Sequence, residues 1–291
     1  MSRLAPLPAP GDWTAEEDRL GFFGPDSVTW RIHTDPSYAV GGLRALMLQA
    51  LHPVAMDGVA TNSAGFRDEW WMRMTRTGQY METITFGTRT EARRIAARVR
   101  GYHRKLSGVE ETTGRAYRVD DPDLLLWVHN GAVDSLLSTA RRAGLPLSDE
   151  DADAYVLEQT AAARLVGVPE HLVPRTVADL DAYFERIRPE LTLTPAASEG
   201  VRRLFVPPMK SWVQVLTPAR PAWGTFATLG FATLPSWARQ LYSMPGFSLT
   251  DAAATAALRA LRTTLLAVPE RARWSPIVRA GYARVAEVPA A

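Results

Sequence analysis

The feature that most constrains this chain is the stretch Asp121–Leu137, which is typical of a helix with one polar residue in its apolar face. Asp121 can accept hydrogen bonds from the free amides of a first turn, and Pro122 suits the first helical position. The residues spaced by three and four positions share one face: Leu125, Leu126, His129, Ala132, Val133, Leu136 and Leu137. If that face is buried, the imidazole of His129 must form hydrogen bonds or bind a ligand, because an unsatisfied buried polar group is costly. Taken alone, the pattern favours a hydrogen-bonded core histidine and leaves the ligand interpretation open.

Helix starts of the same kind recur along the chain, with a serine, threonine or aspartate followed by an acid or proline and then by apolar residues at helical spacing. Helices are expected over 38–51, 54–61, 66–86, 88–106, 122–143, 149–167, 176–188, 195–206, 221–233, 249–267 and 276–286. A short helix with an ordered wrap is expected within 13–36, and a small hairpin within 107–119. The sequence therefore predicts an all-α fold, with a disordered tail over residues 1–12 and a single multi-helix domain over 13–291.

The composition excludes several classes of protein. The 33 lysine and arginine residues nearly balance the 31 aspartate and glutamate residues, so no overall field favours nucleic acid or an anionic membrane. The chain has no cysteine, which rules out disulfides, thiolate metal sites and cysteine nucleophiles. The most apolar run, 222–234, is shorter than the roughly twenty residues that a membrane span needs, and residues 1–10 lack the apolar segment of a signal peptide. We expect a soluble, cytoplasmic protein without a transmembrane segment.

Common catalytic motifs are missing from the chain. It has no G-x-S-x-G elbow, P-loop, H-E-x-x-H or Rossmann glycine pattern, so hydrolase, nucleotide-binding and zincin functions lose support. His33-Thr34-Asp35 has the H-x-D form of some non-haem iron sites. Those sites usually lie on strands, and Pro36 follows directly here, so we interpret the tripeptide as a turn ahead of the next helix.

A few polar residues stand out among apolar neighbours. Arg73, Arg76 and Thr77 fall on one helical face, which is either a solvated basic surface or the polar side of a pocket. His52 lies at a helix junction, and Asp57 follows about one turn later, either at the surface or directed inward. Glu158 is a similar acid on a helix whose neighbours look core-facing, and each residue alone is a weak signal.

Taken together and in order, these segments resemble one known family. The matching segments are Arg44–Pro53, Gly58–Ala60, Phe66-Arg67, Arg73-x-x-Arg76-Thr77, Phe86-Gly87, Asp121–His129, Tyr155-x-x-Glu158 and Leu165–Pro169. They are similar to those of bacterial relatives of the catalytic domain of latex-clearing protein, a rubber oxygenase, and of the oxygenase that shortens the farnesyl chain in mycophenolic acid biosynthesis. The resemblance covers residues 20–240.

The resemblance implies a globin-related, all-α fold that binds haem b, with His129 as the proximal iron ligand. This agrees with a lone imidazole on an apolar face, because haem needs an apolar slot and an axial ligand, and the two arguments together favour the ligand interpretation. In rubber oxygenase an Arg-x-x-Lys-Thr motif forms the polar side of the pocket, and its lysine can cap the iron. Here Arg76 replaces that lysine, and a guanidinium is a very poor metal ligand. We therefore expect an open or water-bound distal site, with Arg73 and Arg76 pairing haem propionates or steering oxygen.

The implied function is a haem-b-dependent oxygenase that uses dioxygen on a hydrophobic, isoprenoid or lipid-like substrate. Rubber oxygenase also uses a distal acid, for which Asp57 or His52 is the candidate here, and Trp127 would line the haem slot or simply pack in the core. The alternatives are a non-catalytic helical protein that holds haem or a lipid, and a family member that has lost haem. The sequence leaves open the substrate, cleavage or hydroxylation, and the oligomeric state.

Overall fold

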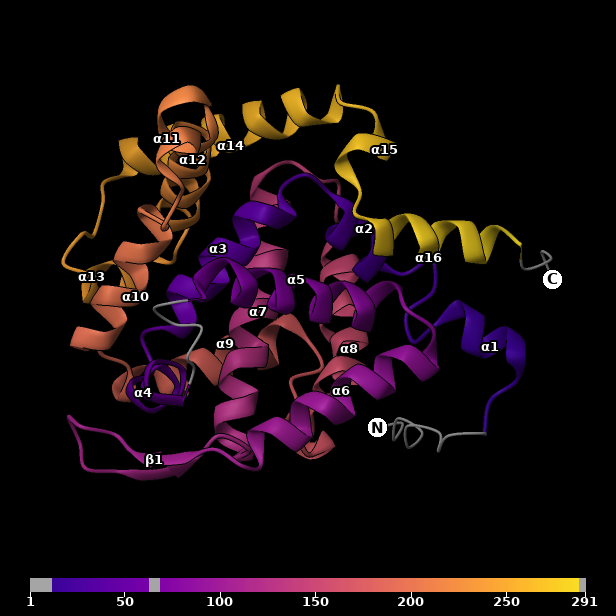
Figure 1. Ribbon diagram of the computed structural model, residues 1–291, viewed down its shortest axis with the longest axis horizontal. Coiled ribbons are helices and arrows are strands. Elements are labelled where there is room, and N and C mark those ends of the chain that lie inside the picture. The colour runs from indigo at the N-terminus through magenta and orange to yellow at the C-terminus, as the bar shows by residue number, and fades with distance from the viewer. Residues whose placement is uncertain (1–11, 63–68, 288–291) are drawn as a thin grey trace.

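The computed structural model describes residues 12–62 and 69–287. Within these ranges sixteen α-helices and one two-stranded hairpin make an all-α fold, as the sequence predicts (Figure 1). The helices are α1 (Ala15–Leu20), α2 (Val28–Thr34), α3 (Tyr38–Gln49), α4 (Pro53–Asn62), α5 (Trp70–Phe86), α6 (Arg89–His103), α7 (Pro122–Arg142), α8 (Asp149–Val166), α9 (Val177–Ile187), α10 (Pro195–Phe205), α11 (Ser211–Leu216), α12 (Ala219–Ala232), α13 (Ser236–Leu241), α14 (Ser248–Leu266), α15 (Glu270–Arg273) and α16 (Pro276–Ala286). Two 3₁₀ turns, η2 (Glu170–Leu172) and η3 (Arg188–Glu190), flank α9.

The predicted hairpin is confirmed as an antiparallel pair of strands, β1 (Ser107–Val109) and β2 (Ala116–Arg118). The expected helix starts are also present, with capping boxes at Thr88 and Ser148. One local prediction was wrong, because α2 continues through His33 and Thr34 and the turn begins only at Asp35. Phe66-Arg67 and the predicted tail, apart from Asp12, lie outside the described residues.

The centre of the molecule is the pairing of α3 with α7, the most extensive helix contact in the fold (Figure 1). Two glycines allow this close approach. A β-carbon at Gly41 would lie 3.0 Å from the Leu136 side chain, and one at Gly131 would lie 3.0 Å from Gln49. Larger residues would force the two helices apart, so small side chains at these positions fix the distance between them.

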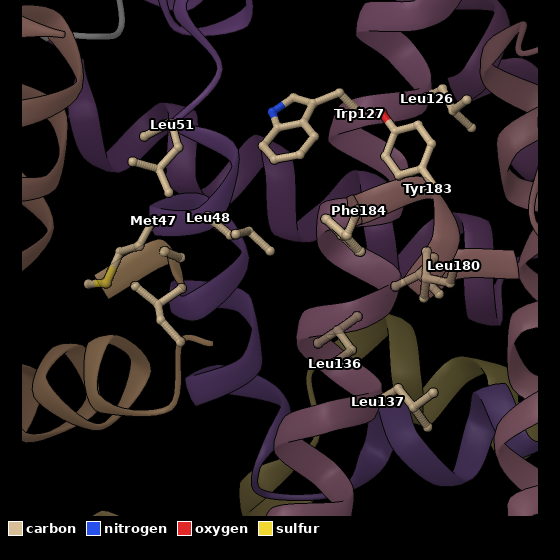
Figure 2. Close-up of a cluster of buried hydrophobic side chains, with 14 of the residues drawn as sticks. Met47, Leu48, Leu51, Leu126, Trp127, Leu136, Leu137, Leu180, Tyr183 and Phe184 are labelled. Carbon is tan, nitrogen blue, oxygen red and sulfur yellow. The ribbon is translucent and has the colours of Figure 1, made fainter. Parts of the chain in front are cut away.

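The main hydrophobic core lies on both sides of this pair and extends to α9. Figure 2 shows Trp127 of α7 near Leu48 of α3, Leu51 just after α3 and the aromatic ring of Phe184 from α9. The Trp127 side chain is fully buried, and its Nε1 donates a hydrogen bond to the Gln49 carbonyl at 3.0 Å. The apolar face of α7 predicted from the sequence therefore packs in the core.

A buried arginine joins α3, α7 and α12. The Arg44 guanidinium donates to the Asp134 carboxylate at 2.6 Å, the Ser135 hydroxyl at 2.7 Å and the Thr233 carbonyl at 3.0 Å. The Arg44 side chain is almost fully buried, and its hydrogen bonds compensate the desolvation of its charge. The central part of the fold is thus held by a polar network as well as by apolar packing.

Candidate functional site

His129 lies midway along α7, on the part of the helix that carries the apolar stripe. Its side chain is half-buried, and burial lowers its pKa to about 4. Among the described residues no group forms a hydrogen bond with its ring. The imidazole is therefore neutral near pH 7, and its nitrogen lone pair is available to a ligand.

A second buried histidine, His33 on α2, shows the opposite arrangement. Its Nδ1 lies 2.9 Å from the Thr85 hydroxyl of α5, and its Nε2 lies 3.1 Å from the Tyr155 hydroxyl of α8. Burial lowers the pKa of His33 to about 3, so it is neutral as well. Both of its ring nitrogens are satisfied, which makes His33 a core histidine that ties α2 to α5 and α8.

The predicted polar face of α5 is present. Arg73 is half-buried, and burial lowers its pKa, while the nearby phenol of Tyr102 on α6 opposes that shift. Arg76 and Thr77 are exposed. Within the described part of the chain, neither the Arg73 nor the Arg76 guanidinium forms a hydrogen bond or an ion pair. Two cations close together on a helix without an acidic partner are suited to bind an anionic group from outside the chain.

The structure does not bring these arginines into described contact with His129. Helix α5 packs on α6, α16 and α2, whereas α7 packs mainly on α3 and α8 and also contacts α2, α4 and α14, so that α2 contacts both helices. In Figure 1 α5 passes across α7, although the two helices are not a closely packed pair. The α5 arginines and His129 of α7 thus lie on two helices that do not pack closely on each other.

His52 and Asp57 are both engaged in hydrogen bonds. The buried His52 Nδ1 accepts from the Ala55 amide at 3.2 Å at the start of α4, and its ring centroid lies 5.8 Å from that of Trp127. Burial is the main cause of a lowered His52 pKa. The half-buried Asp57 carboxylate accepts from the Tyr117 hydroxyl at 2.7 Å, which joins α4 to the hairpin. The structure thus brings His52 together with Trp127, and places Asp57 beside the hairpin.

Glu158 on α8 caps a helix. Its carboxylate accepts from the Val28 amide at 3.1 Å and from the Thr29 amide and hydroxyl at 2.8 and 2.6 Å. These are the free donors at the start of α2, where a negative charge is also favoured by the helix dipole. This geometry accounts for an acid among core-facing neighbours without a catalytic role.

Residues 30–267 match the family model described as "ER-bound oxygenase mpaB/B'/Rubber oxygenase, catalytic domain". The chain belongs to this family. No curated protein and no solved structure matches the chain in the corresponding comparisons. The matched region of this oxygenase-family chain contains every candidate site residue discussed above and ends at the C-terminal end of α14.

Two polar groups of this oxygenase-family chain were missed by sequence reasoning. Asn130, next to His129, is almost fully buried, and its Nδ2 has no hydrogen-bond partner among the described residues. His103 at the end of α6 likewise has a buried Nδ1 without such a partner. A lone asparagine or histidine at a helix position carries no sequence signal that separates a solvated side chain from a buried one.

No group of three or more histidine, cysteine or acidic side chains suited to a metal ion is present in the described residues. Searching those same residues for a helix that is long and apolar enough to cross a membrane also finds none.

Proposed function

We propose that this protein is a haem-b-dependent oxygenase with His129 as its axial ligand. The observation that supports this is a neutral, half-buried imidazole on the central helix with no hydrogen-bond partner among the described residues. A haem requires one axial nitrogen and an apolar surface, and does not require a cluster of protein metal ligands. The donor set of this chain therefore fits haem.

Arg73 and Arg76 would hold the haem propionates. Their guanidinium groups lie one turn apart on α5 and have no acidic partner among the described residues. A guanidinium binds a carboxylate through two parallel hydrogen bonds, and the partial burial of Arg73 strengthens such a pair. Because arginine is a very poor metal ligand, neither guanidinium would compete with dioxygen for the iron. When bound, haem supplies the activation of dioxygen toward an electron-rich carbon–carbon double bond or a nearby C–H bond.

The remaining candidates would orient the substrate or move a proton. Thr77 presents a hydroxyl on the same face as the two arginines and can donate to a bound oxygen atom. Asp57 or His52 would serve as the distal acid or base; at present the Asp57 carboxylate accepts from Tyr117, and His52 Nδ1 accepts from the Ala55 amide. Trp127 would exclude water from the side of α7 nearest α3.

We further propose a hydrophobic substrate of isoprenoid or lipid type. The family description includes rubber oxygenase, and Arg73 is flanked by the apolar or aromatic residues Trp70, Trp71, Met72 and Met74. The protein would provide a dry cavity and orientation for such a chain.

The test is the absorption spectrum of the full chain expressed with added haem, for the wild type beside His129→Ala. We expect an intense Soret band that collapses or shifts in the variant, while far-ultraviolet circular dichroism shows unchanged helix content. Folded wild-type protein that takes up no haem would overturn the proposal. Oxygen consumption by the reduced protein with isoprenoid and lipid substrates then separates an oxygenase from a carrier that binds haem or lipid without turnover.

A further inference from the structure

The part of the chain that forms α10 to α13 has an unusual charge balance. Between Glu199 and Asp251 the sequence contains no acidic residue. The same interval contains five basic residues, Arg202, Arg203, Lys210, Arg220 and Arg239. The whole chain is nearly neutral, so this segment concentrates positive charge in one part of the fold.

Apolar side chains are exposed on the same segment. Six of them, each more than half exposed, lie at the end of α10, on α11 and around the start of α14: Val206, Trp212, Leu216, Met244, Phe247 and Leu249. Single exposed apolar residues are normal on a soluble protein. A concentration of them marks a binding surface, because exposed apolar area is removed from water when a partner covers it.

Contacts within the fold bring these residues to one side of the molecule. The ring of Phe205 lies 6.0 Å from that of Phe231, which lies 5.4 Å from that of Tyr242, so the end of α10 and the connection after α13 meet on α12. Helix α11 also packs on α12. In Figure 1 α10 to α13 and the start of α14, in orange to yellow, form one side of the molecule. We call the six exposed apolar residues with Arg202 and Lys210 the α10–α14 surface.

Some of the positive charge on this surface is directed outward. Arg239 is buried and bound to Asp251 at 2.6 and 3.0 Å, so its charge is compensated inside the protein. Arg202 and Lys210 are exposed, and no described residue forms a hydrogen bond or ion pair with either side chain. The α10–α14 surface therefore combines exposed apolar side chains with uncompensated cations.

We propose that the α10–α14 surface docks on an anionic lipid bilayer. Exposed tryptophan, phenylalanine and leucine side chains insert at the boundary between headgroups and acyl chains, and lysine and arginine attract anionic headgroups. A second copy of the chain fits this surface less well, because a two-fold interface would set the same cations against each other. The protein rests on the membrane through these side chains and does not span it, since no described helix is long and apolar enough.

The surface also adjoins the start of α5. The Trp71 indole donates to the Pro208 carbonyl, and its ring lies 5.3 Å from that of Trp223 on α12. Trp71 and Met72 are themselves partly exposed, and Arg73 follows on the same helix. Docking would thus bring the α5 arginines close to the lipid phase, where a hydrophobic substrate concentrates. This last step rests on the proposed function, whereas the docking does not.

The test is co-sedimentation of the full chain with vesicles of phosphatidylcholine, with and without phosphatidylglycerol. We expect binding to vesicles that contain phosphatidylglycerol, and weaker binding as salt is added, because salt screens the attraction. Phe247→Ser and Trp212→Ser should each lower the partition coefficient about tenfold or more. Arg202→Gln and Lys210→Gln should each lower it about fivefold.

Matched controls lie elsewhere on the surface. Val109→Ser removes an apolar side chain that is 61% exposed on the hairpin, and Arg279→Gln removes an exposed cation on α16. Both should bind vesicles like the wild type. The proposal is overturned if the wild type does not bind anionic vesicles, or if the controls lose as much binding as the surface variants. Wild-type dimers that Phe247→Ser dissociates, without vesicle binding, would assign the surface to a second copy instead. Soret absorbance of the same samples reports separately on haem.

Discussion

The histidines on α2 and α7 have the same chemistry and opposite surroundings. Burial lowers the pKa of both, to about 3 for His33 and about 4 for His129. The ring of His33 is held by the hydroxyls of Thr85 and Tyr155, at 2.9 and 3.1 Å. The ring of His129 has no partner among the described residues.

This difference separates a structural from a functional histidine better than burial does. Desolvation keeps both rings neutral, so the pKa does not distinguish them, although His33 is buried and His129 is only half-buried. The hydrogen bonds distinguish the two rings, because both nitrogens of His33 are already engaged, whereas a ring nitrogen without a protein partner is available to a ligand. His33 is already satisfied by the fold, and His129 is left for the ligand that we propose.

The largest effect that we expect is on haem binding when the two rings are removed in turn. His129→Gly should abolish the Soret band of the haem-loaded protein, and added imidazole should restore it by occupying the vacated space as a free ligand. In His33→Gly added imidazole should not change the Soret band in this way. It would enter a hydrogen-bond network and would not bind at the cofactor. Absorption spectra recorded during an imidazole titration measure whether the Soret band returns in each variant. An unchanged Soret band in His129→Gly would remove His129 from the site and leave the two histidines alike.

For stability we expect the opposite order, with a larger loss when His33 is removed than when His129 is removed. His33→Ala should lower the free energy of unfolding by about 2–4 kcal/mol, because the buried hydroxyls of Thr85 and Tyr155 lose a partner and a cavity remains. Urea unfolding of the haem-free protein measures this change. His171→Ala is the control, since His171 is exposed on η2 and its loss should cost less than about 0.5 kcal/mol. A loss from His129→Ala as large as that from His33→Ala would show that His129 is also held by the fold.

Acid should weaken the folded state through the same two groups. An unfolded histidine has a pKa of about 6.5, so between that value and the lowered folded pKa the unfolded chain binds more protons. The free energy of unfolding therefore falls as pH drops through this window, by about 1.4 kcal/mol per pH unit for each such histidine. His33→Gln should remove one such contribution from the slope, and His129→Gln another. Unfolding measured at several pH values on haem-free protein tests both, and an unchanged slope in either variant would contradict the corresponding shift.

The comparison of the two histidines also shows which features of the fold can be predicted from the sequence and which cannot. The long helices are predictable because their caps are local, as Thr88 and Ser148 show with their capping boxes. The short helices α11 and α13 follow Lys210 and Pro235 at their N-cap positions, which give no side-chain cap, and the sequence does not mark them. Helix α2 has a local cap, because the Ser27 hydroxyl accepts from the Trp30 amide, but its first two amides are satisfied by Glu158 of α8, which is far away in the chain and has no local sequence signal. Likewise, the partners that satisfy a histidine are distant in sequence, and only the assembled structure shows which histidine lacks them.

The smallest effect concerns Asp57, which is a satisfied polar group like His33 and also a candidate distal acid. Tyr117→Phe removes the hydrogen bond between the phenol and the Asp57 carboxylate, 2.7 Å long, and should lower the free energy of unfolding by about 1 kcal/mol. Asp57→Asn tests the same pair from the other side, and the double variant should cost less than the sum of the two, because they share one interaction. The Soret band should be the same in all three variants, since the pair is assigned to the hairpin contact and not to the haem. If Asp57 acts on substrate, Asp57→Asn should lower oxygen consumption while Tyr117→Phe, which frees the carboxylate, leaves it equal or raises it. Equal losses of activity in the two variants would instead show that only the hairpin contact matters.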